Sequence, residues 1–522
     1  MTSAQILVGL LGAVAVLAGA ARHVGMPAPI LLVAGGVLIS LVPGLPDVRL
    51  DPDVVFFIFL PPLVYIAGFR SSPRDLRAQS RRIALLAIGL VVATTAAVAV
   101  AVHAVVPGFG WAEAFVLGAI LAPTDPVAAV AIMQRLRVPP ALNAIVEGES
   151  LVNDGVGLVL YRLAVAATVT GTFSALHGTS ELLVVAAGGV AIGWAAALLI
   201  GLVRGRIDDA PIEIALSLFT PYVAYIAAEA LDVSGILATV TVGLVLGSRS
   251  SGLFSASVRI EAAAFWNATS FLLESALFLL MGLQFRAAAS GIESIEIAHV
   301  ALAVAVTAVV VIGLRVVWMF TGNPLLRWII PGRPATEPPS LGPGARLVAG
   351  WAGMRGAVSL AAALAIPGVV AGGDPFPQRD LIIFVVFCII LIGLLVQGLT
   401  LPLLIRATGM GGGEEDLAAA EALGRAAAAE AALERLDDLD GDPEAARRLR
   451  QLYEARLEHA RAPRDERGDE DRAHVEAFVA LREELLRAER DAVMELHARG
   501  EISEEAVRLL ERDLDLQEAR LD

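Results

Sequence analysis

Long apolar stretches fill the first 408 residues of the chain and constrain its fold more than any other feature. Thirteen of them approach the ~20 residues that a helix needs to cross ~30 Å of hydrocarbon. They lie at about 4–21, 29–46, 53–69, 83–106, 111–134, 142–168, 181–203, 212–229, 234–248, 261–284, 294–320, 346–371 and 380–406. Because lipid offers the backbone no hydrogen-bond partner, such spans must be helical. The sequence therefore predicts an all-α polytopic membrane protein with about thirteen transmembrane helices. Twelve remain an alternative, since the eighth and ninth stretches are short and close together.

Arginines in the connections indicate how these spans are oriented. Fifteen arginines fall in odd-numbered connections, whereas the even-numbered connections hold Arg49, Arg286 and Arg379. Positive residues collect on the cytoplasmic side, so we expect the N-terminus outside and the C-terminal tail inside. The first stretch, Gln5 to Ala21, has no basic segment before it and no cleavage pattern, and we interpret it as a retained helix. The sequence predicts a multi-pass protein of the plasma membrane.

The end of the chain has a different composition. Between Gly411 and Asp522 there are 32 acidic residues and 17 arginines, which account for the whole net charge of −15. The sequence GMGGG at 409–413 is typical of a flexible linker. We therefore expect a transmembrane domain over 1–408, this linker, and a cytoplasmic acidic helical tail over 414–522. A soluble bundle or a partner-binding segment is the plain interpretation of the tail, and regulation of the membrane domain is the sharper one.

Two apolar stretches contain helix-breaking residues beside an ionisable side chain. Prolines flank Thr124 and Asp125 in LAPTDPVAA (121–129), and glycines flank Arg355 in GWAGMRGAVSL (350–360). Proline removes a backbone donor and disfavours helix at the preceding residue. Unwound backbone survives in a membrane only where protein or water covers it. The sequence therefore predicts two discontinuous helices.

The positions of the two breaks suggest an inverted repeat. They lie seven spans apart, so the second unit enters from the opposite side, as in many secondary transporters. We expect the first six spans to match the last six, with both breaks crossing near the midplane. Opposed half-helices bring positive N-terminal ends and negative C-terminal ends together. Asp125 could neutralise one pair of ends and Arg355 the other, although a structural kink is the commoner reason for such a break.

The stretch GESLVND at 148–154 places four polar side chains inside the sixth span. Glu149 and Asn153 share one helix face at i,i+4 spacing, and so do Ser150 and Asp154. A charged carboxylate in hydrocarbon costs several kcal/mol, so these residues need a partner or a function. A buried structural salt bridge is the alternative to a binding site for Asp154.

Oxygen ligands suit a hard monovalent cation. Asp154, Ser150 and Thr124 could supply them, together with carbonyls freed by the break. A buried carboxylate is least costly when protonated, so Asp154 could exchange a proton for a cation. Glu149 and Arg355 are expected to neutralise each other, which would leave Asp154 as the titrating anion.

Three segments together resemble a known family. GAILAPTDPVAAVAI, VEGESLVNDGVGLVLY and GWAGMRGAVSLAAALAIP are similar to segments of monovalent cation:proton antiporters of the sodium/proton exchanger type. The bacterial form of that family has a hydrophilic C-terminal tail. The resemblance covers about residues 5–408. It implies a homodimer whose protomers each have a dimer-contact domain and a mobile core domain, with alternating access by movement of the core.

The resemblance also implies roles for single residues. Asp154 resembles the aspartate that exchanges cation and proton, and Asn153 the asparagine of the electroneutral branch. Thr124 and Asp125 resemble the pair at the unwound helix, where the threonine lends a carbonyl and the aspartate stabilises the crossing. Ser150 resembles a cation ligand.

Two further positions belong to this comparison. Glu149 and Arg355 resemble the pair that braces the asparagine. The chain departs from the family in LPPLVYIAG, where Tyr65 and Ile66 stand at a place in which many relatives carry an acidic residue. A carboxylate of the cation route is therefore expected to be missing there.

Exchange of Na⁺, with K⁺ or Li⁺ as alternatives, for H⁺ is the function that these features predict. With one titrating carboxylate, one cation replaces one proton, so transport should not respond to voltage. No cofactor and no nucleic-acid partner are expected. A cation-coupled solute symporter is the runner-up, but it would need an aromatic-lined cavity and only 6% of residues are aromatic. The chain has no serine-hydrolase, zinc-protease or P-loop motif, which argues against an enzyme.

Three other charged residues lie inside predicted spans. They are Arg162, Glu274 and Arg315. We interpret each as part of a structural ion pair or as a helix-end residue whose charge reaches the interface, with a role in the ion path as the alternative.

Overall fold

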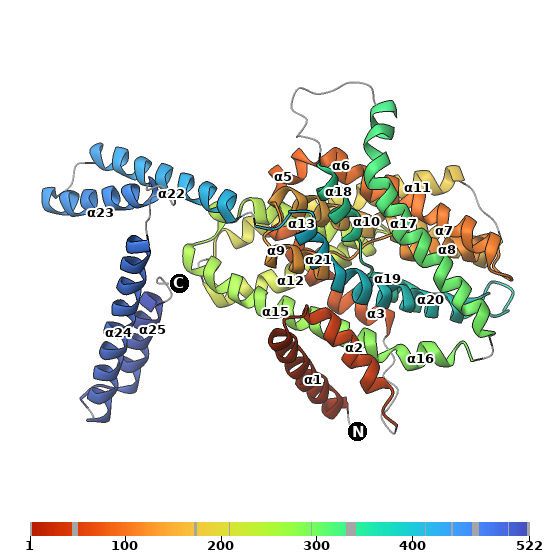
Figure 1. Ribbon diagram of the computed structural model, residues 1–522, viewed down its shortest axis with the longest axis horizontal. Coiled ribbons are helices and arrows are strands. Elements are labelled where there is room, and N and C mark those ends of the chain that lie inside the picture. The colour runs from red at the N-terminus through yellow and green to blue at the C-terminus, as the bar shows by residue number, and fades with distance from the viewer. Residues whose placement is uncertain are drawn as a thin grey trace. The chain divides into compact units, whose positions relative to one another are not determined.

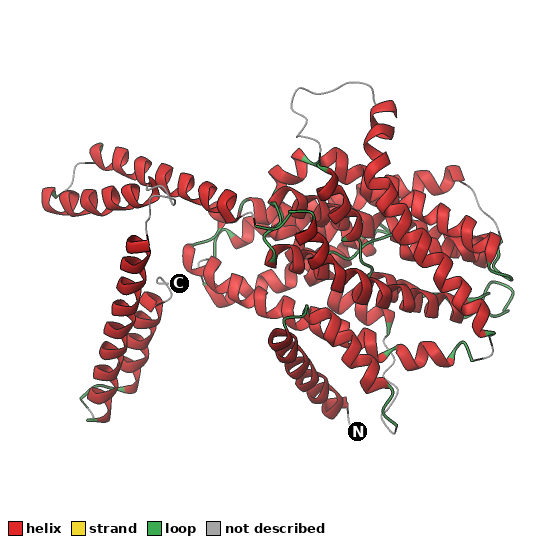
Figure 2. Cartoon of the chain, in the orientation of Figure 1, coloured by secondary structure: helices red, strands yellow, loops and turns green. Residues whose placement is uncertain are grey.

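A computed structural model describes residues 3–43, 51–171, 175–207, 209–293, 295–329, 341–412, 414–439, 442–461, 469–499 and 501–518. Arg49, which was used to predict the orientation, and Gly413, which is part of the predicted linker, lie outside the described residues. Figure 2 shows that the described parts are helical, and their one β-type contact is the isolated bridge between Val369 and Pro375. The chain divides into two compact units, Met1–Gly413 and Glu414–Asp522.

The first unit is a bundle of helices connected by short loops (Figure 1). In chain order they are α1 (Ser3–Val24), α2 (Ala28–Ser40), α3 (Pro52–Val54), α4 (Leu60–Arg70), α5 (Pro73–Ala78), α6 (Ser80–Ala84), α7 (Val91–Val105), α8 (Trp111–Leu121), α9 (Val127–Arg135), α10 (Pro140–Thr170), α11 (Ala175–Arg204), α12 (Ala210–Glu229), α13 (Gly235–Ser248), α14 (Ser250–Leu253), α15 (Ala256–Leu283), α16 (Phe285–Ser290), α17 (Ile297–Ile329), α18 (Pro343–Trp351), α19 (Ala357–Leu364), α20 (Arg379–Ile392) and α21 (Gly398–Ala407). Three π-helical segments, η1 (Val55–Phe59), η2 (Leu85–Leu90) and η3 (Gly393–Gln397), continue some of these helices without a break.

Eight helices of the described chain are long and apolar enough to cross a membrane. They are Pro52–Arg70, Ser80–Val105, Pro140–Thr170, Leu183–Arg204, Ala210–Glu229, Ala256–Ser290, Ile297–Thr321 and Arg379–Ala407. Shorter apolar helices cover Val8–Val24, Ala28–Ser40, Trp111–Leu121 and Gly235–Ser248. The predicted class is confirmed: the protein is an all-helical polytopic membrane protein.

The helices of the first unit pack in two groups. In one group α13 packs on α4, α11 and α12, and α2 packs on α15. In the other, α8 packs on α7 and α10, while α17 packs on α7 and α18. Helices α18 to α20, from late in this unit, lie beside α8 and α10 from early in it (Figure 1). Both stretches with predicted breaks therefore belong to the second group.

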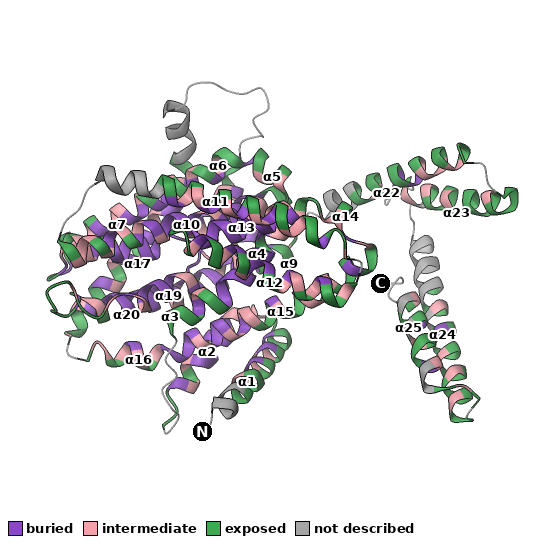
Figure 3. Cartoon of the chain, turned by 180° about the vertical axis from the view of Figure 1, so that it is seen from behind, coloured by how far each residue is buried: buried purple, intermediate pink, exposed green. Residues whose placement is uncertain are grey.

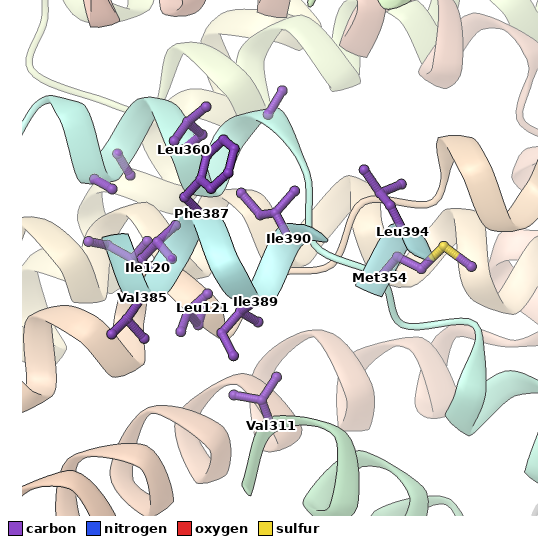
Figure 4. Close-up of a cluster of buried hydrophobic side chains, with 14 of the residues drawn as sticks. Ile120, Leu121, Val311, Met354, Leu360, Val385, Phe387, Ile389, Ile390 and Leu394 are labelled. Carbon is purple, nitrogen blue, oxygen red and sulfur yellow. The ribbon is translucent and has the colours of Figure 1, made fainter. Parts of the chain in front are cut away.

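A continuous apolar cluster joins helices of both groups. Figure 4 shows Ile120 and Leu121 of α8 gathered with Met354, Leu360 and Phe387, and each of these side chains is at most 2% exposed. Between helices in a membrane such a cluster is stabilised by close packing rather than by removal of apolar surface from water. This packing holds the polar groups described below in fixed positions.

The second unit consists of two helical hairpins. Helices α22 (Glu414–Asp437) and α23 (Pro443–Arg461) pack together, and so do α24 (Asp469–Ala498) and α25 (Glu504–Glu518). Exposed ion pairs connect the members of each hairpin, such as Arg490 with Asp515 at 2.7 Å. Figure 3 shows that exposed residues predominate along these helices. Regulation by this unit stays a prediction.

Candidate functional site

Two helices of the first unit are interrupted. The chain unwinds between α8 and α9 over 122–126, and between α18 and α19 over 352–356. The first interruption holds two prolines, which cannot donate to the helical ladder. The second holds two glycines, which give the backbone the freedom to leave the helix. Local sequence therefore accounts for both breaks.

The two interruptions cross each other. The backbone N–H of Asp125 donates to the carbonyl oxygen of Met354 at 2.8 Å. The hydroxyl of Ser359 in α19 donates to the carbonyl oxygen of Ile120 in α8 at 2.7 Å. Unwound backbone is thus satisfied by the opposite break, which meets the requirement that lipid cannot supply a partner.

Asp125 lies at the beginning of two half-helices. Its carboxylate accepts from the backbone N–H of Val127, the first residue of α9, at 3.0 Å. The same carboxylate lies against Gly356, which directly precedes α19, so closely that a Cβ on Gly356 would overlap it. Helix N-termini carry partial positive charge. One carboxylate therefore faces the positive ends of both α9 and α19.

Arg355 lies at the opposite kind of helix end. It is 2% exposed, and its Nε donates to the carbonyl oxygen of Leu121, the last residue of α8, at 3.0 Å. Its Nη1 donates to the carbonyl oxygen of Gly353 inside the second break. These carbonyls have lost their helical partners and carry partial negative charge. A cationic side chain stabilises them.

The predicted pair of Glu149 with Arg355 is wrong. Glu149 instead pairs with Arg315 of α17 through two parallel contacts, of which Nη2 to Oε2 measures 2.8 Å. Arg355 directs its N–H groups at the carbonyls exposed by the break. Arg315 fills the place beside Gly353, where a Cβ would overlap its guanidinium group. The interpretation of Arg315 as part of a structural ion pair is confirmed.

The polar face of α10 contacts the first break. Ser150 donates through its hydroxyl to the Thr124 carbonyl at 2.8 Å, and Asn153 donates through Nδ2 to the Thr124 hydroxyl at 2.9 Å. The Thr124 hydroxyl donates to Oε1 of Glu149 at 3.4 Å. The structure therefore brings four predicted site residues together. The carbonyl predicted as a cation ligand is occupied here by Ser150.

Asp154 lies one residue beyond this network and differs from its neighbours. The described residues provide its carboxylate with no hydrogen-bond or ion-pair partner, and its charged neighbour is Asp125. The Oδ1 atom of Asn153 is also buried without a partner in the described part of the chain. One free carboxylate beside neutral oxygens is the donor set that suits a singly charged cation. The ions themselves would be transported, so they are substrates.

The segment that departs from the family lies in a different environment. Tyr65 and Ile66 are buried in an apolar cluster with Trp266. The Tyr65 hydroxyl accepts from Arg204, which forms a buried ion pair with Glu213 at 2.5 Å. Arg204 is one of the fifteen arginines that the sequence assigns to odd-numbered, cytoplasmic connections. The acidic residue Glu213, nine residues later, is the sequence feature that could have indicated an ion pair.

Crossed broken helices with charged groups at their ends, inside an all-helical membrane bundle, define a secondary transporter and not an enzyme. The family described as sodium/hydrogen exchanger, transmembrane, matches residues 12–407. A relative named as an uncharacterised Na⁺/H⁺ exchanger of Mycobacterium tuberculosis is 36% identical over 99% of this chain and 96% of its own length. The chain belongs to the sodium/hydrogen exchanger family. The resemblance seen in its sequence is thereby confirmed.

Two further comparisons extend this result. A sodium, potassium, lithium and rubidium/H⁺ antiporter of Bacillus pumilus is 34% identical over 73% of this chain and 58% of its own length. The solved structure of the sodium proton antiporter MjNhaP1 from Methanocaldococcus jannaschii matches with a TM-score of 0.60 at 18% identity. That match covers 79% of this chain and 100% of the solved one, and it shows a shared fold.

Proposed function

We propose that the protein exchanges a monovalent cation for H⁺ across the plasma membrane, with Na⁺ as the first candidate and K⁺ or Li⁺ as alternatives. The observation that carries this proposal is the carboxylate of Asp154, which has no hydrogen-bond or ion-pair partner among the described residues and has Asp125 of the crossing as its charged neighbour. Glu149, the other carboxylate deep in α10, is neutralised by Arg315. The names of the relatives support the same exchange, since they describe Na⁺/H⁺ exchangers or antiporters.

Cation and proton would compete for Asp154. In the cation-bound state Asp154, Ser150 and the Thr124 carbonyl would be ligands, which requires the Ser150–Thr124 hydrogen bond to rearrange. In the other state Asp154 would hold the proton. Because each state carries the same charge, the exchange would be electroneutral and driven by concentration gradients.

The remaining site residues would hold the geometry rather than the ion. Asp125 and Arg355 stabilise the four half-helix ends at the crossing. Glu149, fixed by Arg315, and Asn153 position Thr124. Displacing either group would move the Thr124 oxygen atoms away from Asp154.

The proposed topology has thirteen spans. Eight are the long helices, three are the short apolar helices α1, α2 and α13, and two are the broken pairs α8–α9 and α18–α19. The first and last six spans would be inverted repeats, with the N-terminus outside and the tail over 414–522 in the cytoplasm. We propose a homodimer, with two helix groups that move relative to each other during alternating access.

Proton movement in proteoliposomes tests the proposal. Acid-loaded vesicles with a pH-sensitive dye receive Na⁺ or K⁺ with the voltage clamped at zero. Wild type should alkalinise the interior, the rate should not change when a voltage is imposed, and Asp154→Asn should fall to the rate of protein-free vesicles. Asp374→Asn, an exposed aspartate in a loop, is the matched control and should behave as wild type.

Two results would contradict the proposal. An undiminished signal in Asp154→Asn would remove Asp154 from the exchange. A wild-type protein that moves protons with neither cation would point instead to the symporter alternative.

A further inference from the structure

Glu274 is a carboxylate deep inside a spanning helix. It lies nine residues before the end of α15, which corresponds to about 14 Å along the helix axis. The side chain is half-buried, and the described residues give it neither a hydrogen bond nor an ion pair. The structural ion pair expected from the sequence is therefore not formed, and the residue is too deep to be a helix-end residue. An unpaired acid at such a depth is costly and needs a function.

Most other acids in the described spans are paired or near an end. Glu213 and Glu229 lie in the first and last turns of α12 and pair with arginines. Among the acids of the long apolar helices that the structure describes, three lie more than eight residues from both ends, and Glu149 among them pairs with Arg315. The two that remain are Asp154 and Glu274.

Contacts between α4 and α15 place Glu274 at a defined depth. Arg70, the last residue of α4, donates to Oδ1 of Asn267 in α15 at 2.5 Å. Glu274 lies two turns beyond Asn267 on the same helix face, about 10 Å further from this contact at 1.5 Å per residue. Ile66 lies one turn from Arg70, about 6 Å from the same contact. Glu274 and Ile66 therefore differ in depth by less than one helical turn.

Glu274 also lies on the helix that packs against the crossing. Helix α15 packs on α19, whose first turn begins at the Asp125 carboxylate. The charged groups that interact electrostatically with Glu274 are Asp125 and, from the inner end of α4, Arg70. Asp125 interacts in the same way with Asp154. Asp125 is thus a charged neighbour of both Asp154 and Glu274.

A cavity lies at the other end of the contact between α15 and α19. It has a volume of about 790 Å³ and includes Gln284 just after α15, Leu360 and Leu364 of α19, and the charged residues Arg379 and Asp380. In the proposed topology this is the outer side. Leu360 lies one turn from Gly356, the glycine in contact with Asp125. The same helix pair therefore has a cavity with charged residues at its outer end, and Glu274 lies on α15 nine residues before that end.

Building on the proposed function, we infer that Glu274 is a second acidic residue of the cation route, which holds the cation transiently between the outer cavity and Asp154. A carboxylate in a low-dielectric passage raises the local concentration of cations. Glu274 holds the cation only in passing and returns to its starting state in each cycle, so the ratio of cation to proton is unchanged. Its effect is on cation affinity and not on coupling.

The test measures exchange rate against cation concentration in the proteoliposomes described above. Glu274→Gln should raise the half-saturating cation concentration by about tenfold, while the maximal rate stays within about twofold of wild type. Glu261→Gln, an exposed acid on the same helix, is the control and should change neither value. Glu274→Asp, which keeps a carboxylate at this position, should have a half-saturating concentration close to that of wild type.

An unchanged half-saturating concentration in Glu274→Gln would overturn the inference. So would a fall in maximal rate at unchanged half-saturation, which is the signature of a purely structural role. If Glu274→Gln does not reach the membrane, Glu274→Ala removes the same charge and the same two results apply. Wild-type protein without exchange activity would contradict the proposed function itself, whereas active wild type with unaltered Glu274 variants would contradict this inference alone.

Discussion

Two carboxylates on helix α10 have opposite surroundings although they lie only five residues apart. Glu149 is 1% exposed and receives two hydrogen bonds from Arg315, so its charge is permanently balanced. Asp154 has no partner in the described part of the chain. Removing either member of a buried pair would leave the other charge uncompensated, so the two side chains hold each other in place. In the proposed function, the acid without a partner exchanges the ions and the paired acid supports it.

Breaking the pair should have the largest effect on the structure. Arg315→Met leaves Glu149 charged and buried without a partner, which should cost about 3–5 kcal/mol of stability. The double variant Arg315→Met/Glu149→Gln should recover most of this loss, because no uncompensated charge remains. Thermal unfolding of purified protein in detergent measures both. An Arg315→Met variant as stable as wild type would show that the Arg315–Glu149 pair does not stabilise α10.

Moving Asp125 should mainly affect transport. Gly356→Ala places a methyl group where the Asp125 carboxylate lies, so the carboxylate must leave the ends of α9 and α19. Small displacements at reacting groups can lower rates by as much as about a hundredfold, so we expect a fall of at least tenfold. Gly368→Ala is the control, since nothing lies within 4 Å of its added Cβ. Equal exchange rates for the two variants would rule out this role of Asp125.

Part of this site follows from local sequence and part does not. The membrane class was predictable from the length of the apolar stretches, and the family was predictable from three sequence segments. The breaks also follow from local chemistry, since proline and glycine act on their own backbone. The partner of Glu149 could not be predicted, because several arginines lie in or between spans and the pair joins α10 with α17, which are far apart in the sequence. The absence of a partner for Glu274 is likewise visible only in three dimensions.

The smallest effect is expected where ion pairs are exposed. Arg490 contacts Asp515 and Glu518 on the surface of the α24–α25 hairpin. Exposed pairs contribute little to stability because water and salt screen them. Arg490→Ala should therefore leave helicity, measured by circular dichroism, and exchange rate close to wild type. A large loss of exchange in this variant would instead indicate a regulatory contact of the tail. The exposed pairs of Arg490 and the buried pair of Arg315 would then no longer differ in their effect.

Proton release on cation binding tests the central claim most directly. Purified protein in weakly buffered detergent solution is mixed with Na⁺, and separately with K⁺, while a pH-sensitive dye reports released protons. Competition at Asp154 predicts close to one proton released per protomer at saturating cation in wild type, and none in Asp154→Asn. Cation binding by wild type without proton release, or release that persists in Asp154→Asn, would contradict exchange at this carboxylate.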